Sequence, residues 1–172
     1  GYEAGKSIRH DTSDYNVIMG YQASVGGTGA RTQSVAIGYR AWGNGGSANN
    51  LGGSENVFIG AESGGGTWET GASDGNTAIG WNTMKGAMNG ANNNVAVGKS
   101  ALAAITTGDS NVAVGMQAGL NFDAEIYNTF VGAYSGAGGI NGADYVTAIG
   151  GQTLGGAITQ DGTVAVGYNA LN

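Results

Sequence analysis

A five-residue pattern recurs nine times along this chain, and it restricts the fold more than any other feature of the sequence. Its copies end in nine glycines, which are Gly20, Gly38, Gly60, Gly80, Gly98, Gly115, Gly132, Gly150 and Gly167. The spacings between successive glycines are 18, 22, 20, 18, 17, 17, 18 and 17 residues. A period of this length is the sequence signature of a solenoid, in which each repeat packs only against its neighbours.

The second and fourth positions of the pattern carry Val, Ile or Thr, apart from Met19, and β-branched residues of this kind are typical of strands. Because these two positions share one face of a strand, we expect them to form the interior. The predicted core ladder consists of Val17, Met19, Val35, Ile37, Val57, Ile59, Ile79, Val95, Val97, Val112, Val114, Val131, Ile149, Val164 and Val166. The third position points the other way and is Ala in six copies, which predicts that another chain packs closely against it.

The remaining positions predict how each coil closes. The fifth-position glycine suits a sharp corner. The segments after it, such as residues 99–102 and 168–171, end in a small and an apolar residue and predict a second short strand. Asn occupies the first position in six copies and is expected to form an amide ladder from coil to coil.

The fold class predicted is therefore all-β, a parallel β-solenoid or β-roll of about nine coils. Each repeat of 17–22 residues would supply two short strands. Residues 1–15 carry no copy of the pattern and are expected to be an N-terminal cap or junction, and residues 16–172 a single solenoid domain.

Composition excludes several classes of function. The net charge of −6 and the pI near 4.4 argue against a nucleic-acid-binding surface, which would need a basic stripe. The chain has no Cys and therefore no disulfide or thiol nucleophile. No apolar run of about 18 residues is present, so membrane insertion is not expected. The chain does not begin with Met, and we expect it to be a processed product or a piece of a longer polypeptide.

The repeated unit resembles a known family. Residues 34–38 and 94–98 read Ser-Val-Ala-Ile-Gly and Asn-Val-Ala-Val-Gly, and this unit is similar to the head repeat of trimeric autotransporter adhesins, a left-handed parallel β-roll in a homotrimer. The adhesin period is shorter, and linkers such as residues 90–94 and 107–111 resemble more closely the repeats of phage tail-fibre and related virion fibre proteins. The resemblance covers about residues 15–172.

The resemblance implies a homotrimeric, non-enzymatic attachment fibre at a virion surface or otherwise outside the cell. Its partners would be two further copies of itself and a host cell-surface glycan or protein. The head of a bacterial adhesin is the alternative identity. An ice-binding solenoid is a further alternative, although such proteins usually align Thr-x-Thr ranks. A polysaccharide-degrading spike is a third, although those helices usually have longer coils.

No catalytic, cofactor-binding or metal-binding residue is assigned. Gly98-Lys99-Ser100 does not complete a phosphate-binding loop motif, because that motif needs Gly at position 93, which is Asn. His10 is the only histidine, so no histidine cluster is available.

Acidic residues recur six positions before the pattern glycine, and we interpret them as turn residues whose side chains bond to nearby backbone N–H groups. They are Asp14, Asp74, Asp109, Asp144 and Asp161. A Ca²⁺ site is the alternative interpretation, because Ca²⁺ binds several converging oxygen ligands.

Aromatic residues are the better indication of a binding surface. Trp42, Trp68 and Trp81 all lie in the first half of the chain, as do the two longest repeats, with insertions in residues 43–55 and 64–75. Insertions of this kind often form the binding face of a solenoid, and exposed Trp rings suit contact with sugars. These three residues are the candidate surface-binding residues. The structural alternative is that they close coil ends or fill seams between subunits.

Overall fold

The computed structural model describes the whole chain apart from residues 7–12, 28, 44–51, 69–70 and 139–141. The described residues contain eleven short β-strands and no helix, and they form the predicted parallel β-solenoid. The strands are β1 (Val17–Met19), β2 (Arg31–Thr32), β3 (Val35–Ile37), β4 (Gly53–Ser54), β5 (Val57–Ile59), β6 (Thr77–Ile79), β7 (Val95–Val97), β8 (Val112–Val114), β9 (Thr129–Val131), β10 (Thr147–Ile149) and β11 (Val164–Val166).

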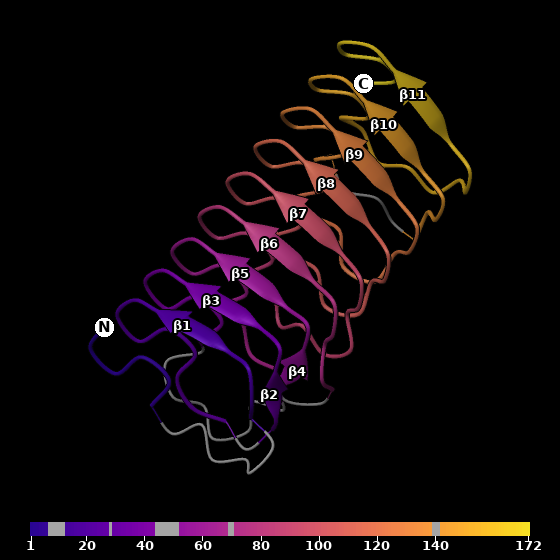
Figure 1. Cartoon of the computed structure of the whole chain (residues 1–172). Helices are drawn as coiled ribbons and strands as arrows, with labels where there is room; N and C mark the ends of the chain where they lie inside the picture. Colours follow the sequence, from indigo (N-terminus) through magenta and orange to yellow (C-terminus); the bar gives the residue numbers. More distant parts are fainter. Residues whose placement is uncertain (7–12, 28, 44–51, 69–70, 139–141) are drawn as a thin grey trace.

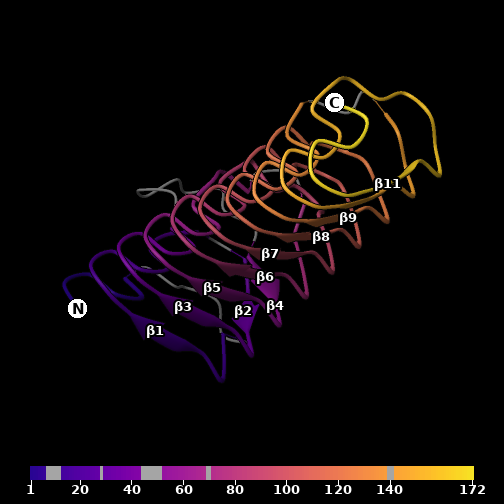
Figure 2. The ribbon, with the colours of Figure 1, turned by 90° about the horizontal axis from the view of Figure 1, so that it is seen from above.

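Nine of these strands, one from each copy of the pattern, form a single parallel sheet along one side of the molecule (Figure 1). The register stacks equivalent positions, so that Ala96 of β7 pairs with Ala78 of β6 and Ala113 of β8. At a spacing of about 4.8 Å, nine strands extend for about 38 Å. Figure 2 shows the coils following one another along one axis. The two remaining strands, β2 and β4, pair with each other in the repeats that end at Gly38 and Gly60.

The corner after each strand is a column of stacked glycines. All nine pattern glycines have φ between 124° and 139°, a conformation that L side chains rarely adopt. A Cβ on any of the first eight would also lie within 2.7 Å of the carbonyl oxygen of the equivalent glycine in the next coil. The corner therefore needs glycine for two independent reasons, the backbone angle and the close approach of the neighbouring coil.

The segment after each corner is a series of turns, so the prediction of a second strand there is wrong. Two of its residues have left-handed backbone conformations, for example Ser100 at φ 56° and Leu102 at φ 46°. The N–H of Ser100 donates to Trp81 O of the preceding coil, and that of Leu102 donates to Ala118 O of the following coil. The alternating backbone conformation bends the chain too tightly for a strand while keeping its polar groups paired between coils.

The interior of the solenoid is formed by the third strand position, which corrects the predicted core. Ala36, Phe58 and Ala78 are fully buried, and the other third positions are buried as well, except the half-buried Ile18. None of the residues at the second and fourth positions is buried. The two-residue alternation is present, but the β-branched residues lie on the outer face, and Ala or Phe occupies the inner one in every copy but the first.

The whole predicted core ladder consequently lies on the outer face of the sheet. Its members are Val17, Met19, Val35, Ile37, Val57, Ile59, Ile79, Val95, Val97, Val112, Val114, Val131, Ile149, Val164 and Val166.

Interior side chains share a small volume, and the sequence compensates within each coil. In five of the six coils with an inward Ala, the fourth residue after the corner is large, as Ala96 and Leu102 illustrate. Where the inward residue is Phe58, the corresponding residue is Gly64, and a Cβ added there would lie 2.5 Å from the Phe58 ring. Close packing of this kind makes each coil sensitive to a single added or lost methylene.

A fully buried asparagine ladder runs beside the strands, as the sequence predicts. Oδ1 of Asn94 accepts from the backbone N (2.8 Å) and Nδ2 (3.1 Å) of Asn111. Nδ2 of Asn94 donates to Asn76 Oδ1 (3.1 Å) and to Gly108 O (2.8 Å), which lies in its own coil. Every donor and acceptor of the buried amide is therefore paired. The fully buried members are Asn56, Asn76, Asn94, Asn111 and Asn128.

The first residues of the chain repeat the geometry that follows each corner. A Cβ on Gly1 would meet the carbonyl oxygen of Gly20, as occurs between successive corner glycines. The N–H of Gln22 donates to Tyr2 O at 2.8 Å, in the same way as the turns of later coils bond to each other. Residues 1–6 thus extend the stack beyond the first recognised copy of the pattern.

The asparagine ladder should dominate stability. Replacing Asn94 with Leu removes the partners of the Asn111 N–H, of one Asn111 amide proton and of Gly108 O, all buried. At about 1–3 kcal/mol for each unpaired group, we expect a loss of at least about 3 kcal/mol in the free energy of unfolding, measured by chemical denaturation. Asn16→Leu, at the half-buried end of the ladder, is the control and should cost about 1 kcal/mol. Equal losses would contradict this account.

The compensation inside each coil predicts a rescue. Phe130→Ala should cost about 3–5 kcal/mol because it leaves a cavity. Gly136→Leu should also destabilise, because a Cβ at Gly136 would contact the Phe130 ring. The double variant recreates the Ala and Leu combination of other coils, so the losses should be less than additive by at least about 2 kcal/mol in denaturation experiments. Additive losses would show that the two positions do not share a volume.

Candidate functional site

The outer face of the nine-stranded sheet is a continuous apolar surface. Its two columns, the second and fourth strand positions, contain fifteen apolar residues, three Thr and no charged residue. The columns lie about 7 Å apart and run for about 38 Å. Exposure is substantial even in the middle of the sheet, where Ile79 is 38% exposed, and it reaches 66% at Val166. Apolar surfaces of this extent are typical of protein–protein contacts.

A second surface feature lies on the turns, at the residue directly after each corner glycine. Tyr2, Tyr21 and Tyr39 form a stack there, with ring centroids 5.3 and 5.6 Å apart, and all three are exposed. The Arg40 guanidinium lies 5.2 Å from the Tyr39 ring centroid and ends the stack. A network of polar side chains follows alongside, in which Arg40 Nε donates to Gln22 Oε1 at 3.0 Å. Together these residues place aromatic rings next to hydrogen-bonding groups on one exposed strip.

Trp81 occupies the same position as the stacked tyrosines in a later coil. Its side chain is 49% exposed, and Lys99 Nζ lies 4.9 Å from its ring centroid. Of the three predicted surface-binding residues, it is the one that the structure places on the surface. Lys99 belongs to the Gly-Lys-Ser sequence, and its contact with the Trp81 ring of the preceding coil is a structural role for that tripeptide.

Trp42 and Trp68 are buried, which corrects their prediction as surface-binding residues. They are 1% and 0% exposed and pack against Phe58, with all three ring centroids 5.6–5.8 Å apart. The extra residues of the longer repeats therefore widen the interior of these coils to hold large rings. Residues 44–51 and 69–70 of the two insertions lie outside the described residues.

The recurring acidic side chains form a ladder of their own. Asp74 Oδ1 accepts from the backbone N of Ser54 at 2.6 Å, and Asp109 Oδ1 accepts from that of Asn92 at 2.6 Å. Asn92 Oδ1 accepts from the Asp74 N at 2.9 Å. The same bond to the preceding coil is made by Asp144 and Asp161. These side chains thus bond to backbone N–H groups of the neighbouring coil, where the sequence suggested a bond within the same turn.

The structure describes no candidate metal centre, since none of its described His, Cys, Asp and Glu side chains gather in groups of three or more. His10 lies outside the described residues. The protein also has no helix of membrane-spanning length and hydropathy in the part of the chain that the structure describes.

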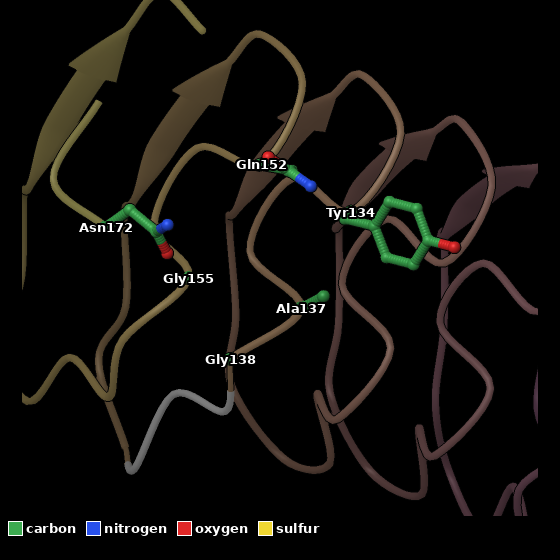
Figure 3. A pocket seen from close by; sticks show the side chains of 6 residues that line it. All are labelled: Tyr134, Ala137, Gly138, Gln152, Gly155 and Asn172. Atoms are coloured by element: carbon green, nitrogen blue, oxygen red, sulfur yellow. The ribbon is translucent and has the colours of Figure 1, made fainter. Parts of the chain in front are cut away.

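A shallow hollow of about 330 Å³ lies on the turns near the C-terminal end (Figure 3). It is lined by Tyr134, Gln152 and Asn172 from three successive coils, and the Tyr134 ring points away from the amides of the other two (Figure 3). The remaining lining residues are Ala137, Gly138 and Gly155. The hollow is open and small, and it adds a polar patch to the same row of turns that carries the tyrosine stack.

Comparison with protein-family models, with curated proteins and with solved structures finds no match to this chain. The functional conclusions therefore depend on its own surfaces. The tyrosine stack could be anticipated only in part from sequence, because Tyr21 and Tyr39 follow pattern glycines but Tyr2 precedes the first recognised copy.

Proposed function

We propose that this chain is a non-enzymatic segment of a homotrimeric attachment fibre, of the phage tail-fibre or virion-fibre type. It would act outside the cell as a rigid shaft that also contacts a host surface. The observation that carries the proposal is the uncharged apolar face along all nine strands of the sheet. Association buries such a face most simply, since water contact with apolar side chains is unfavourable.

The basis for self-association differs from the one that the sequence suggested. The alanines of the third position face the interior, so they cannot receive a neighbouring chain. The β-branched residues of the second and fourth positions take that role instead. Two straight columns of similar side chains suit contact with an equally regular partner, and another copy of this chain is such a partner. The number of three subunits comes from the resemblance to trimeric fibres.

The chemistry of the turns supports a role in attachment. The tyrosine stack, Trp81 and the hollow near Tyr134 all lie on the turns, away from the sheet face. Rings beside amide and guanidinium groups are suited to sugars, whose apolar faces stack on rings while hydroxyls form hydrogen bonds. A host cell-surface glycan is therefore the preferred partner, and a protein receptor is the alternative. The head of a bacterial adhesin would use the same surfaces and is the alternative identity.

An ice-binding solenoid is a second candidate function because of one observation. Thr77, Thr129 and Thr147 stand on the flat outer face, within a regular array of β-branched residues. A flat array of this kind can match an ice surface. The two functions make opposite demands on the face, since ice binding needs it free and a fibre needs it covered. Thermal hysteresis shown by a monomeric protein would favour ice binding.

The fibre proposal predicts the mass in solution. Sedimentation equilibrium of the wild-type chain should give three times its 17.0 kDa mass. Val97→Lys combined with Val114→Lys places two charges in the middle of the outer face and should give monomers with unchanged circular dichroism, because neither side chain is in the core. Gln117→Lys, on the turns, is the charge control and should remain trimeric. A monomeric wild type would refute the proposal.

The attachment role predicts which aromatic residues matter. On a glycan array, Tyr39→Ala and Trp81→Ala should each weaken binding about three- to tenfold, which corresponds to about 0.5–1.5 kcal/mol for a ring contact. Met116→Ala is the matched control, because Met116 occupies the same position after its corner glycine and is also exposed. Undiminished binding by both aromatic variants would place the contact surface elsewhere.

A further inference from the structure

Buried polar atoms without partners gather inside the first three coils, between Gly20 and Gly80. Six such side-chain atoms occur in the part of the chain that the structure describes, and five belong to Ser24, Arg31, Trp42 and Trp68. The sixth, Asn82 Oδ1, lies in the turn of a later coil. Native interiors pair nearly all of their buried polar groups, so a local concentration of unpaired ones needs a physical explanation.

These residues are in contact with one another. The Arg31 guanidinium lies 5.1 Å from the Trp42 ring centroid, and the Trp42 and Trp68 rings are 5.8 Å apart. Nη1 of Arg31 donates to Ser24 O at 3.4 Å, while Nε and Nη2 have no partner among the described residues. Arg31 is 1% exposed, so water outside the solenoid does not reach its charge.

The buried guanidinium is charged and forms no ion pair with any residue that the structure describes. Burial lowers the pKa of Arg31 to about 10, so the side chain stays protonated at neutral pH. The face of Trp42 supplies some stabilisation through a cation–π contact. A buried charge nevertheless requires a partner of opposite sign or a full set of hydrogen bonds.

The chemistry of the unpaired atoms indicates which partner would satisfy them. Arg31 Nε and Nη2 and the two indole Nε1 atoms are donors only, and the Ser24 hydroxyl can also donate. A water molecule accepts about two hydrogen bonds and brings two protons that need acceptors of their own. A small anion accepts several donors, brings none and neutralises the guanidinium.

We propose that the interior of the first three coils, between Gly20 and Gly80, binds a single small inorganic anion, of the chloride class, between Arg31 and the indoles of Trp42 and Trp68. The proposal does not depend on the fibre function. Binding would couple the anion to folding, because Arg31, Trp42 and Trp68 come into contact only when the first coils have formed. The anion would then stabilise these first three coils, while the later coils carry no such requirement.

Thermal unfolding in sodium chloride tests the proposal. The melting temperature of the wild-type protein should rise with chloride concentration at constant ionic strength, with sodium gluconate as the replacement salt, by about 5 °C at a roughly hundredfold excess over Kd. Arg31→Met should remove this dependence and keep the fold, since the apolar replacement needs no counter-charge. Arg40→Met removes an arginine from the surface row and should keep the full chloride dependence.

Crystals grown in sodium bromide give an independent readout. Anomalous diffraction should place a bromide ion beside Arg31 in the wild type and none in Arg31→Met. A wild-type melting temperature that is independent of chloride would overturn the proposal. So would equal chloride dependence in wild type and Arg31→Met, or a water molecule at the position expected for bromide.

Discussion

The buried amide ladder is the interaction on which the rest of this structure depends. A coil of 17 to 22 residues cannot enclose a core by itself, and its strand has only three residues. What each coil lacks is supplied by its neighbours, through backbone hydrogen bonds and, in six of the nine copies of the pattern, through an Asn side chain at the first position. Asn94 shows how complete this pairing is, because its four side-chain hydrogen bonds join three successive coils and its own return segment. A stack held in this way is stable as a whole and not coil by coil.

The same arrangement separates interior from exterior in an unusual manner. Alanines and a few large residues fill the narrow interior, while the Val and Ile residues at the second and fourth strand positions lie outside. The energetic gain from burying the β-branched residues of the strands is therefore only partly realised within a single chain. Association of several chains would realise it, which is why the proposed oligomer and the observed fold of one chain are parts of one physical explanation.

Sequence reasoning could predict the period, the corner glycines and the amide ladder, because Gly recurs at every corner and Asn at the first position of six copies. It assigned the wrong face of the strand to the interior, since alternation shows two faces but not which one is enclosed. One signal could have identified the enclosed face. The third strand position and the fourth residue after the corner vary inversely in size, as Phe58 with Gly64 and Ala96 with Leu102 show. The turns were less predictable, because residue types such as those of Ser100 and Leu102 do not favour a left-handed backbone conformation. Trp42 and Trp68 were misplaced because an insertion can widen a coil as well as extend a loop.

The rise of the solenoid is independent of the size of its coils. The coil between Gly38 and Gly60 contains five more residues per turn than the coil between Gly98 and Gly115, yet both advance the sheet by one strand, because strand pairing alone sets the spacing. The length of the solenoid along its axis and the cross-section of its coils are therefore independent of each other. Gain or loss of whole repeats would change its reach in steps of about 4.8 Å. Insertions within a repeat would change its surface without shifting any other coil, so the two properties can evolve separately.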